Sequence, residues 1–186
     1  NQPQPTYLEK MRAALMGDYE KNGQQAEVFV SAEIRQRLKT LTEVKDIAPP
    51  ENLNATLRPY QARGFAWLMK NLRLGIGALI ADDMGLGKTL QVIATLLQLK
   101  NDGELNKTKA LVVVPTTLMT NWQREIAKFA PELSVGVYHG SNRVLPEAVK
   151  DLPDVTLTTY GLMRRETEKL AGYKWRLLVL DEAQAV

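Results

Sequence analysis

The chain has 186 residues, of which 45% are hydrophobic, and this is enough for one ordinary domain with a small accessory segment. Its formal net charge is only +3, from 24 basic and 21 acidic residues, so nucleic-acid binding is permitted but not indicated. The absence of cysteine and the single histidine exclude disulfides, thiolate zinc sites and thiol catalysis, and the apolar runs are too short to cross a bilayer.

The first 50 residues predict a small, mostly helical extension. Apolar residues at helical spacing run through residues 7–20, and Asn22-Gly23 is expected to end that helix. Residues 28–30 are a short candidate strand, and Ser31 is a candidate N-cap for a second helix. Ala48-Pro49-Pro50 is typical of a linker, so we expect an extension over residues 1–50 and a main domain over residues 51–186.

From residue 57 onward the sequence alternates between helical stripes and apolar strands. The stripes centre on Leu68, Ile93 and Trp122, and five strands are predicted at residues 76–81, 110–114, 135–138, 155–159 and 177–180. The strands are almost wholly apolar, as expected when helices cover both faces of a sheet. The pattern therefore predicts an α/β fold with a mostly parallel sheet sandwiched by helices, and ligands beyond the carboxyl ends of its strands.

A glycine-containing loop follows the first predicted strand and opens a helical pattern. Gly85 and Gly87 allow the backbone to curl, and the backbone N–H groups of such a loop and of the helix N-terminus favour anions. Lys88 is placed to reach the β- and γ-phosphates of a nucleoside triphosphate, and the Thr89 hydroxyl suits Mg²⁺. The predicted nucleotide-binding residues are Asp82, Asp83, Met84, Gly85, Leu86, Gly87, Lys88 and Thr89.

An acidic pair follows the last predicted strand. Asp181 is expected to hold Mg²⁺ and Glu182 to polarise a water molecule, so Lys88, Asp181 and Glu182 are the predicted catalytic residues. The alternative is an ordinary strand–turn–helix with a solvated lysine, and Asp82 stands where the general phosphate-loop pattern has glycine. That alternative does not predict the acidic pair, and the pair therefore favours a nucleotide site.

Several segments, in order, resemble the motifs of SWI/SNF-type ATPases of helicase superfamily two. The segment from Leu57 to Gln61, with Gly64 to Leu68, is similar to the stretch that precedes the family's phosphate loop. Residues 82–91 resemble motif I, in which an acidic residue replaces the first glycine, so the departure at Asp82 is the family's own form. Further similarities are Pro115-Thr116 with Asn121-Trp122 to motif Ia, residues 157–160 to motif Ib, and residues 181–184 to motif II.

The resemblance implies a RecA-like ATPase lobe that uses ATP and Mg²⁺, in a double-stranded DNA translocase that remodels protein–nucleic acid complexes. It implies that Gln61 recognises adenine, an assignment its paired amide donor and acceptor would suit. The nucleic-acid contacts that it implies are Thr116, Thr158, Thr159 and Arg164. RNA polymerase or another DNA-bound protein is a candidate partner, and the expected location is intracellular: the bacterial cytoplasm or nucleoid, or a eukaryotic nucleus.

The same resemblance implies parts that these 186 residues do not contain. The family's motors have a second RecA-like lobe that supplies an arginine finger, a group that contributes about 10³–10⁵ in rate in related phosphoryl-transfer enzymes. We therefore expect this chain alone to bind Mg-nucleotide weakly and to hydrolyse it barely. In this fold a further strand normally lies between the strands of motifs I and II, and without it we expect a gap with unpaired edges or a different closure.

Two other functions are consistent with parts of the sequence. Asp181-Glu182-Ala183-Gln184 is close to the signature of RNA-directed superfamily-two helicases, although the form of motif I and Asn121-Trp122 argue against that group. A non-hydrolysing, nucleotide-dependent scaffold that recruits partners through residues 1–50 is the other alternative. Glu182 argues against the scaffold, because a binding switch does not need a carboxylate that activates water.

Overall fold

The computed structural model describes residues 19–21, 24–26, 47–81 and 85–183. The chain divides into two compact units, residues 1–45 and residues 46–186. In the first unit, β1 (Tyr19–Lys21) pairs antiparallel with β2 (Gln24–Ala26). Tyr19 and Glu20 are therefore strand residues, and the helix predicted over residues 7–20 is wrong at this end. Its remainder, residues 28–30 and Ser31 lie outside the described residues.

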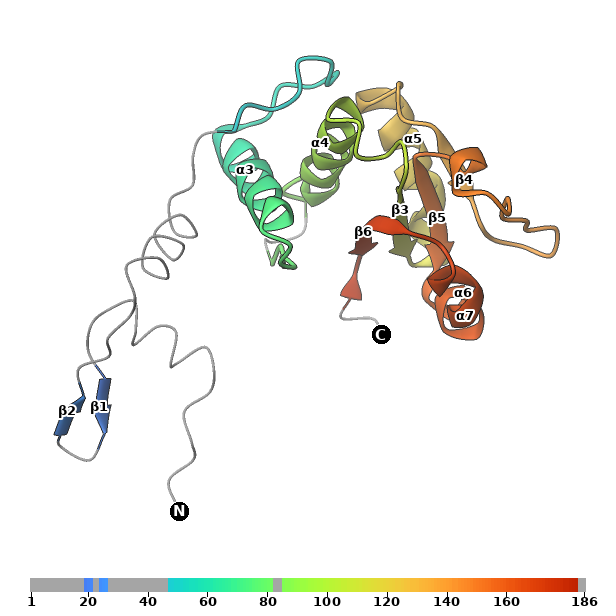
Figure 1. The fold of residues 1–186 in the computed structure, drawn as a ribbon. Helices are drawn as coiled ribbons and strands as arrows, with labels where there is room; N and C mark the ends of the chain where they lie inside the picture. Colours follow the sequence, from blue (N-terminus) through green and yellow to red (C-terminus); the bar gives the residue numbers. More distant parts are fainter. Residues whose placement is uncertain (1–18, 22–23, 27–46, 82–84, 184–186) are drawn as a thin grey trace. The chain divides into compact units, whose positions relative to one another are not determined.

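The second unit is built on a four-stranded parallel sheet with the order β4-β5-β3-β6 (Figure 1). The strands are β3 (Lys109–Val114), β4 (Val135–Val137), β5 (Val155–Thr159) and β6 (Trp175–Leu180). The longer helices are α3 (Pro59–Arg73), α4 (Lys88–Asn101) and α5 (Met119–Phe129), and the shorter ones are α6 (Tyr160–Arg165) and α7 (Thr167–Ala171). Two 3-10 turns, η1 (Thr116–Leu118) and η2 (Val149–Asp151), lie between them. The predicted α/β fold with a parallel sheet is confirmed.

Helices and loops cover both faces of the central strands. Alternate side chains of a strand point to opposite faces, and β3 divides accordingly. Ala110, Val112 and Val114 pack in a large core with α3, α4 and α5, whereas Leu111 and Val113 pack in a second core with residues from α6, α7 and the loops around residues 138–152. The sheet is thus sandwiched, as its apolar strands predicted.

The packing of α3 on α4 requires a glycine. A Cβ on Gly64 of α3 would lie 1.9 Å from Oε1 of Gln91 on α4, and Gln91 is fully buried. Pro59 occupies the first turn of α3, where its missing N–H costs no hydrogen bond. This close contact places the start of α3 beside the start of α4.

The segment 76–81, predicted as the strand that carries the phosphate loop, does not form a strand in the structure. Leu79 is 77% exposed, and β6, the outermost strand of the order, exposes Leu178 and Leu180. Among the described residues, no strand lies between these two segments, and a cavity separates them instead. A gap of this kind was expected from the sequence. A strand needs a hydrogen-bonded neighbour, and apolar residues alone do not supply one.

No helix in the described part of the chain is both long and apolar enough to cross a membrane.

Candidate nucleotide-binding site

Two glycines near the end of the phosphate loop have backbone conformations that favour glycine. Gly85 has a φ of 84° and Gly87 a φ of 74°, both in the left-handed region where other residues are strained. Gly87 is the N-cap of α4, so Lys88 and Thr89 are the first two residues of that helix. The first backbone N–H groups of a helix have no partner within the helix, which makes this end a place for an anion. Asp82, Asp83 and Met84 lie outside the described residues.

The acidic pair lies at the carboxyl end of β6, the strand that pairs with β3 at the edge of the sheet. The backbone N–H of Asp181 donates to Val113 O of β3 at 2.9 Å, so the ladder of the sheet continues one residue beyond β6. Glu182 has a φ of 53°, a left-handed conformation that is uncommon for a residue with a side chain. Its N–H donates to Oδ1 of Asp181 at 3.1 Å. The left-handed turn at Glu182 therefore comes directly after the metal-binding candidate, at the end of the β6 ladder.

One cavity of about 650 Å³ brings the two predicted segments together. Lys88 and Thr89 line it from the start of α4, and Asp181 and Glu182 line it from the end of β6. Its walls continue along the gap described above, between residues 77–81 and residues 177–180. The predicted nucleotide site needs these two segments to lie on one cavity, and in the structure they do.

The start of α3 holds the phosphate loop by its backbone. The Tyr60 hydroxyl and the Gln61 amide Nε2 both donate to the Leu86 carbonyl, each at 3.1 Å. Gln61 Oε1 accepts the N–H of Arg58 at 2.9 Å, which caps the helix. A Cβ on Gly87 would lie 2.4 Å from Gln61 Nε2, so the loop contacts this amide closely. From the sequence, Gln61 was predicted to recognise the adenine base. The role of Tyr60 and Gln61 in positioning the phosphate loop was not predicted.

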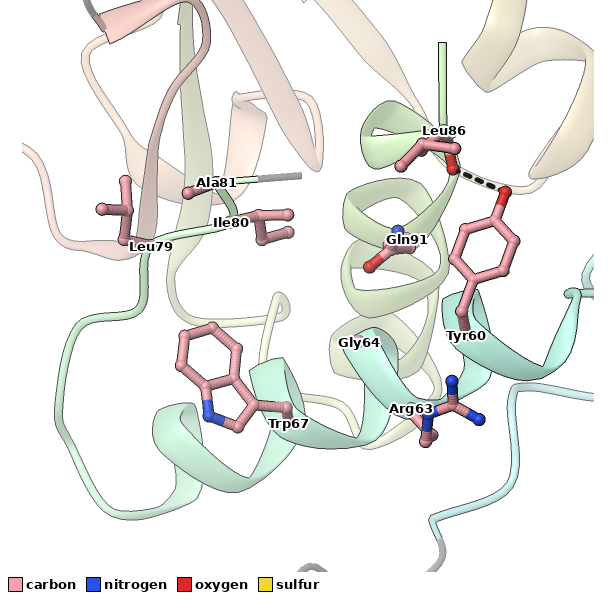
Figure 2. A pocket seen from close by; sticks show the side chains of 9 residues that line it. All are labelled: Tyr60, Arg63, Gly64, Trp67, Leu79, Ile80, Ala81, Leu86 and Gln91. Atoms are coloured by element: carbon pink, nitrogen blue, oxygen red, sulfur yellow. Dashed lines mark hydrogen bonds between the residues drawn. The ribbon is translucent and has the colours of Figure 1, made fainter. Parts of the chain in front are cut away.

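A second cavity, of about 580 Å³, lies next to the first between α3, α4 and residues 79–81 (Figure 2). Figure 2 shows Trp67 and Ile80 on one side of it and the Tyr60–Leu86 hydrogen bond on the other. The Gln91 amide lines this cavity, and neither its nitrogen nor its oxygen finds a hydrogen-bond partner among the described residues. Gln91 is fully buried, and its side chain lies against Gly64 of α3.

Two aromatic side chains contact Asp181, and sequence reasoning gave neither this role. The indole Nε1 of Trp122 donates to Asp181 Oδ2 at 2.7 Å, and the Tyr160 hydroxyl donates to the Asp181 carbonyl at 2.7 Å. Burial, and then the negative charges of Asp181 and Glu182, raise the pKa of the Tyr160 phenol, which therefore stays a protonated donor. The signal in the sequence is topological: all three residues follow the ends of parallel strands, which meet at one edge of the sheet.

The four predicted nucleic-acid contacts differ in how accessible they are. Thr116 and Arg164 are exposed, at η1 and on α6. Thr159 is buried and its Oγ1 caps α6 by accepting the N–H of Leu162 at 3.4 Å. Thr158 is fully buried and its hydroxyl donates to Tyr138 O at 3.0 Å. A phosphate contact by the Thr158 hydroxyl would require that internal bond to open, so this residue acts as part of the core in the structure.

The donors at the first cavity fit Mg²⁺. Mg²⁺ in nucleotide sites takes one or two protein oxygens and completes its shell with phosphates and water. Thr89 and Asp181 supply a hydroxyl and a carboxylate to the same cavity. Among the described residues no group of three or more His, Asp or Glu side chains could hold a metal without such help.

A parallel sheet with a phosphate loop and an acidic pair on one cavity defines a nucleotide-binding α/β lobe. The model of the SNF2-related domain family matches residues 60–186, and the chain belongs to that family. It is 41% identical over 165 residues to YwqA of Bacillus subtilis, a protein named as a candidate ATP-dependent helicase/translocase, and 37% identical over 150 residues to helicase SWR1 of Debaryomyces hansenii. These alignments cover 84% and 78% of the chain.

A solved structure gives the same result for the fold. The SWI2/SNF2 ATPase core of Sulfolobus solfataricus in complex with double-stranded DNA is similar to 76% of the chain, with a TM-score of 0.67 and 39% sequence identity. The chain spans only part of these proteins: 18% of YwqA, 9% of SWR1 and 29% of the archaeal core. The family and the fold of this lobe are therefore established, and the activity of a whole motor is a proposal for this chain.

Proposed function

We propose that the chain is the nucleotide-binding lobe of a DNA-stimulated ATPase that moves along double-stranded DNA and remodels protein–nucleic acid complexes. The observation that carries the proposal is the cavity on which Lys88 and Thr89 converge with Asp181 and Glu182 from another part of the sequence. The archaeal relative bound to double-stranded DNA supports the choice of nucleic acid. Such a motor would work on chromosomal DNA, in a bacterial cytoplasm or a eukaryotic nucleus, and a DNA-bound complex such as RNA polymerase is a candidate for remodelling.

The residues of the cavity divide the proposed chemistry among them. The N-terminus of α4 and the Lys88 ammonium bind the phosphates of ATP. Gln61 contacts adenine once its amide is released from Arg58 and Leu86, which it bonds in the structure. Thr89 and Asp181 hold Mg²⁺, which when bound neutralises charge on the phosphates. Glu182 orients and polarises the attacking water. Thr116, Thr159 and Arg164 contact the DNA backbone at the carboxyl edge of the sheet.

The nucleotide site is tested by binding measurements on the full-length polypeptide that carries this lobe. Lys88→Ala is expected to reduce the affinity for Mg-ATP at least about 10-fold, because a charge-assisted contact to phosphate is lost. The control is Lys107→Ala, an exposed lysine that precedes β3 and so lies at the opposite edge of the sheet. Equal Mg-ATP affinity in the two variants would remove the basis of the proposal.

The motor is tested by turnover. We expect duplex DNA, and not RNA, to stimulate ATP hydrolysis by the full-length protein, and Glu182→Gln to trap ATP without movement along DNA. Stimulation by RNA alone would favour an RNA-directed helicase, and unchanged remodelling by the Glu182→Gln variant would favour a scaffold. The isolated 186-residue chain is expected to hydrolyse ATP barely at all, since an arginine finger from a second lobe contributes about 10³–10⁵ in rate. Robust DNA-stimulated turnover by the chain alone would contradict that expectation.

A further inference from the structure

Every polar atom of Asp181 has a hydrogen-bond partner. Its carboxylate Oδ2 accepts the Trp122 indole N–H and its Oδ1 accepts the N–H of Glu182, while its backbone carbonyl accepts the Tyr160 hydroxyl. Its own N–H donates to Val113. An ionised carboxylate has about four lone-pair sites, so each oxygen keeps capacity for a further ligand. The side chain is thus held in one orientation while it can still bind a cation.

The two aromatic donors come from the parts of the chain that the family resemblance associates with nucleic acid. Trp122 lies on α5, which follows directly after η1 and the exposed Thr116. Tyr160 is the first residue of α6 and follows Thr159, which caps that helix. Trp122 is six residues after Thr116 and Tyr160 is one residue after Thr159, so each donor lies close in sequence to a proposed DNA contact.

Both donors are packed against the cores, one on each face of the sheet. Trp122 is 2% exposed and belongs to the large core, so its indole N–H shifts only if α5 shifts. Tyr160 packs against the second core, on the other face of the sheet. Asp181 is consequently held by a donor from each side of the sheet, and a displacement at either strand end changes its surroundings.

We propose that Trp122 and Tyr160 are positioning residues for Asp181 and couple a ligand at the strand ends of Thr116 and Thr159 to the metal-binding carboxylate. This inference rests on the proposed function and adds to it the route by which DNA stimulates the site. The physical warrant is that groups hydrogen-bonded around a metal ligand orient it, and that their loss typically costs about 10- to 100-fold in metal affinity or activity. Trp122 orients the Asp181 carboxylate directly, and Tyr160 acts on it through the Asp181 backbone carbonyl. The 2.7 Å bond from an indole N–H to a carboxylate is of the strong, charge-assisted type.

The structure supplies a matched control for each donor. Trp175 also donates its indole N–H at 2.7 Å, to Leu170 O, and Tyr173 donates its hydroxyl to Pro146 O at 2.9 Å. Both controls pack against the second core, and neither lines the cavity of the candidate site. Trp122→Phe and Tyr160→Phe can therefore be compared with Trp175→Phe and Tyr173→Phe, which remove the same groups elsewhere.

The experiment uses the full-length polypeptide and measures ADP binding as Mg²⁺ is raised. We expect Trp122→Phe and Tyr160→Phe each to raise the Mg²⁺ concentration at half-saturation about 10-fold, with ADP affinity in the absence of Mg²⁺ unchanged. The tryptophan emission of the parent protein should also change when Mg-ADP binds, and that change should disappear in Trp122→Phe and persist in Trp175→Phe. Tyr160→Phe removes one oxygen from a half-buried ring, so it tests the inference even if Trp122→Phe does not fold.

Coupling to DNA is measured as a pair of affinities. In the parent protein, duplex DNA and Mg-ADP should change each other's affinity by the same factor, because binding linkage is reciprocal. That factor should fall towards one in Trp122→Phe and Tyr160→Phe and stay unchanged in the two control variants. Parent-like Mg²⁺ dependence and parent-like coupling in both donor variants would overturn the inference and leave the proposed function intact. A parent protein that binds no Mg-nucleotide would refute the proposed function itself.

Discussion

Four segments of the second unit are of similar length but differ in structure. The strands β3 and β5 and the segments 76–81 and 177–180 are all short and rich in aliphatic residues, although β5 also contains three threonines. Every residue of β3 and β5 is buried, whereas Leu79, Leu178 and Leu180 are exposed. We refer to the first pair as the closed half and to the second pair as the open half.

The comparison shows that burial of a strand depends on its neighbours more than on its own composition. β3 has a hydrogen-bonded strand on each side and a covered face above and below. β6 has a partner on one side, and residues 76–81 have none in the described part of the chain. The cavity of the candidate site opens into this same gap, so the open half is also the half where a ligand has access.

The largest predicted difference between the halves is in the cost of removing a leucine. Leu157→Ala in β5 should lower the free energy of unfolding by about 2–5 kcal/mol, because a fully buried side chain leaves a cavity. Leu178→Ala in β6 should cost less than about 1 kcal/mol, because half of that side chain is already in solvent. Urea unfolding of the two variants measures both values. Equal losses would mean that the open half is closed in solution.

Asp154, which directly precedes β5 of the closed half, is a buried charge whose contribution to stability depends on pH. Burial raises the pKa of Asp154, but hydrogen bonds from Lys100 and Ser134 outweigh this and hold it below its usual value. Because the folded-state pKa is the lower one, the stabilisation is complete above the ordinary aspartate pKa of about 3.9 and is lost as the pH falls through the folded-state value.

Asp154→Asn should therefore lower the free energy of unfolding at neutral pH by about 2 kcal/mol, with the difference shrinking in acid. Asp151→Asn replaces an exposed carboxylate on the neighbouring η2 and serves as the control. Urea unfolding at several pH values checks the result. If Asp154→Asn lowers the free energy of unfolding equally at pH 3 and at pH 7, the assigned role of the charge is wrong.

The smallest predicted difference concerns two glycines. Gly64→Ala should destabilise the protein by about 1–2 kcal/mol, because the added Cβ would lie 1.9 Å from the buried Gln91 amide. Gly77→Ala, in the open half, should change stability by less than about 0.5 kcal/mol, because a Cβ there meets no atom within 4 Å. Thermal unfolding of both variants tests the pair. Destabilisation by Gly77→Ala would show that residues 76–81 are packed.

The sequence predicted the parallel sheet because the apolar runs at β3 and β5 leave few other ways to bury both faces. It also predicted that Lys88 and Asp181 would lie on one cavity, and they do, although only Asp181 follows a strand in the structure. The strand predicted at residues 76–81 is wrong, because the apolar pattern of a segment does not show whether a neighbouring strand is there to pair with it. The prediction also failed at Tyr19, where Asn22-Gly23 was interpreted as a helix end although this pair is a strong signal for a hairpin between two strands.

The contacts of Asp181 show where prediction from pattern ends. Trp122 and Tyr160 lie 59 and 21 residues away in the sequence, and their hydrogen bonds arise only from the strand order β5-β3-β6. A helical stripe identifies Trp122 as buried but does not say that its one polar atom faces a carboxylate. Hydrogen bonds that support a site residue in this way cannot be predicted from the sequence pattern, because they depend on how the helices and strands are placed relative to each other.

The left-handed backbone at Glu182 has a consequence for attempts to improve this protein. A residue with a Cβ pays of order 1 kcal/mol to hold that conformation, which glycine would adopt freely. A screen that selects only for resistance to heat would therefore favour glycine at this position and discard the carboxylate. Variants selected in that way would be more stable but would lack the carboxylate proposed to polarise the attacking water, so position 182 should be held fixed in any such screen.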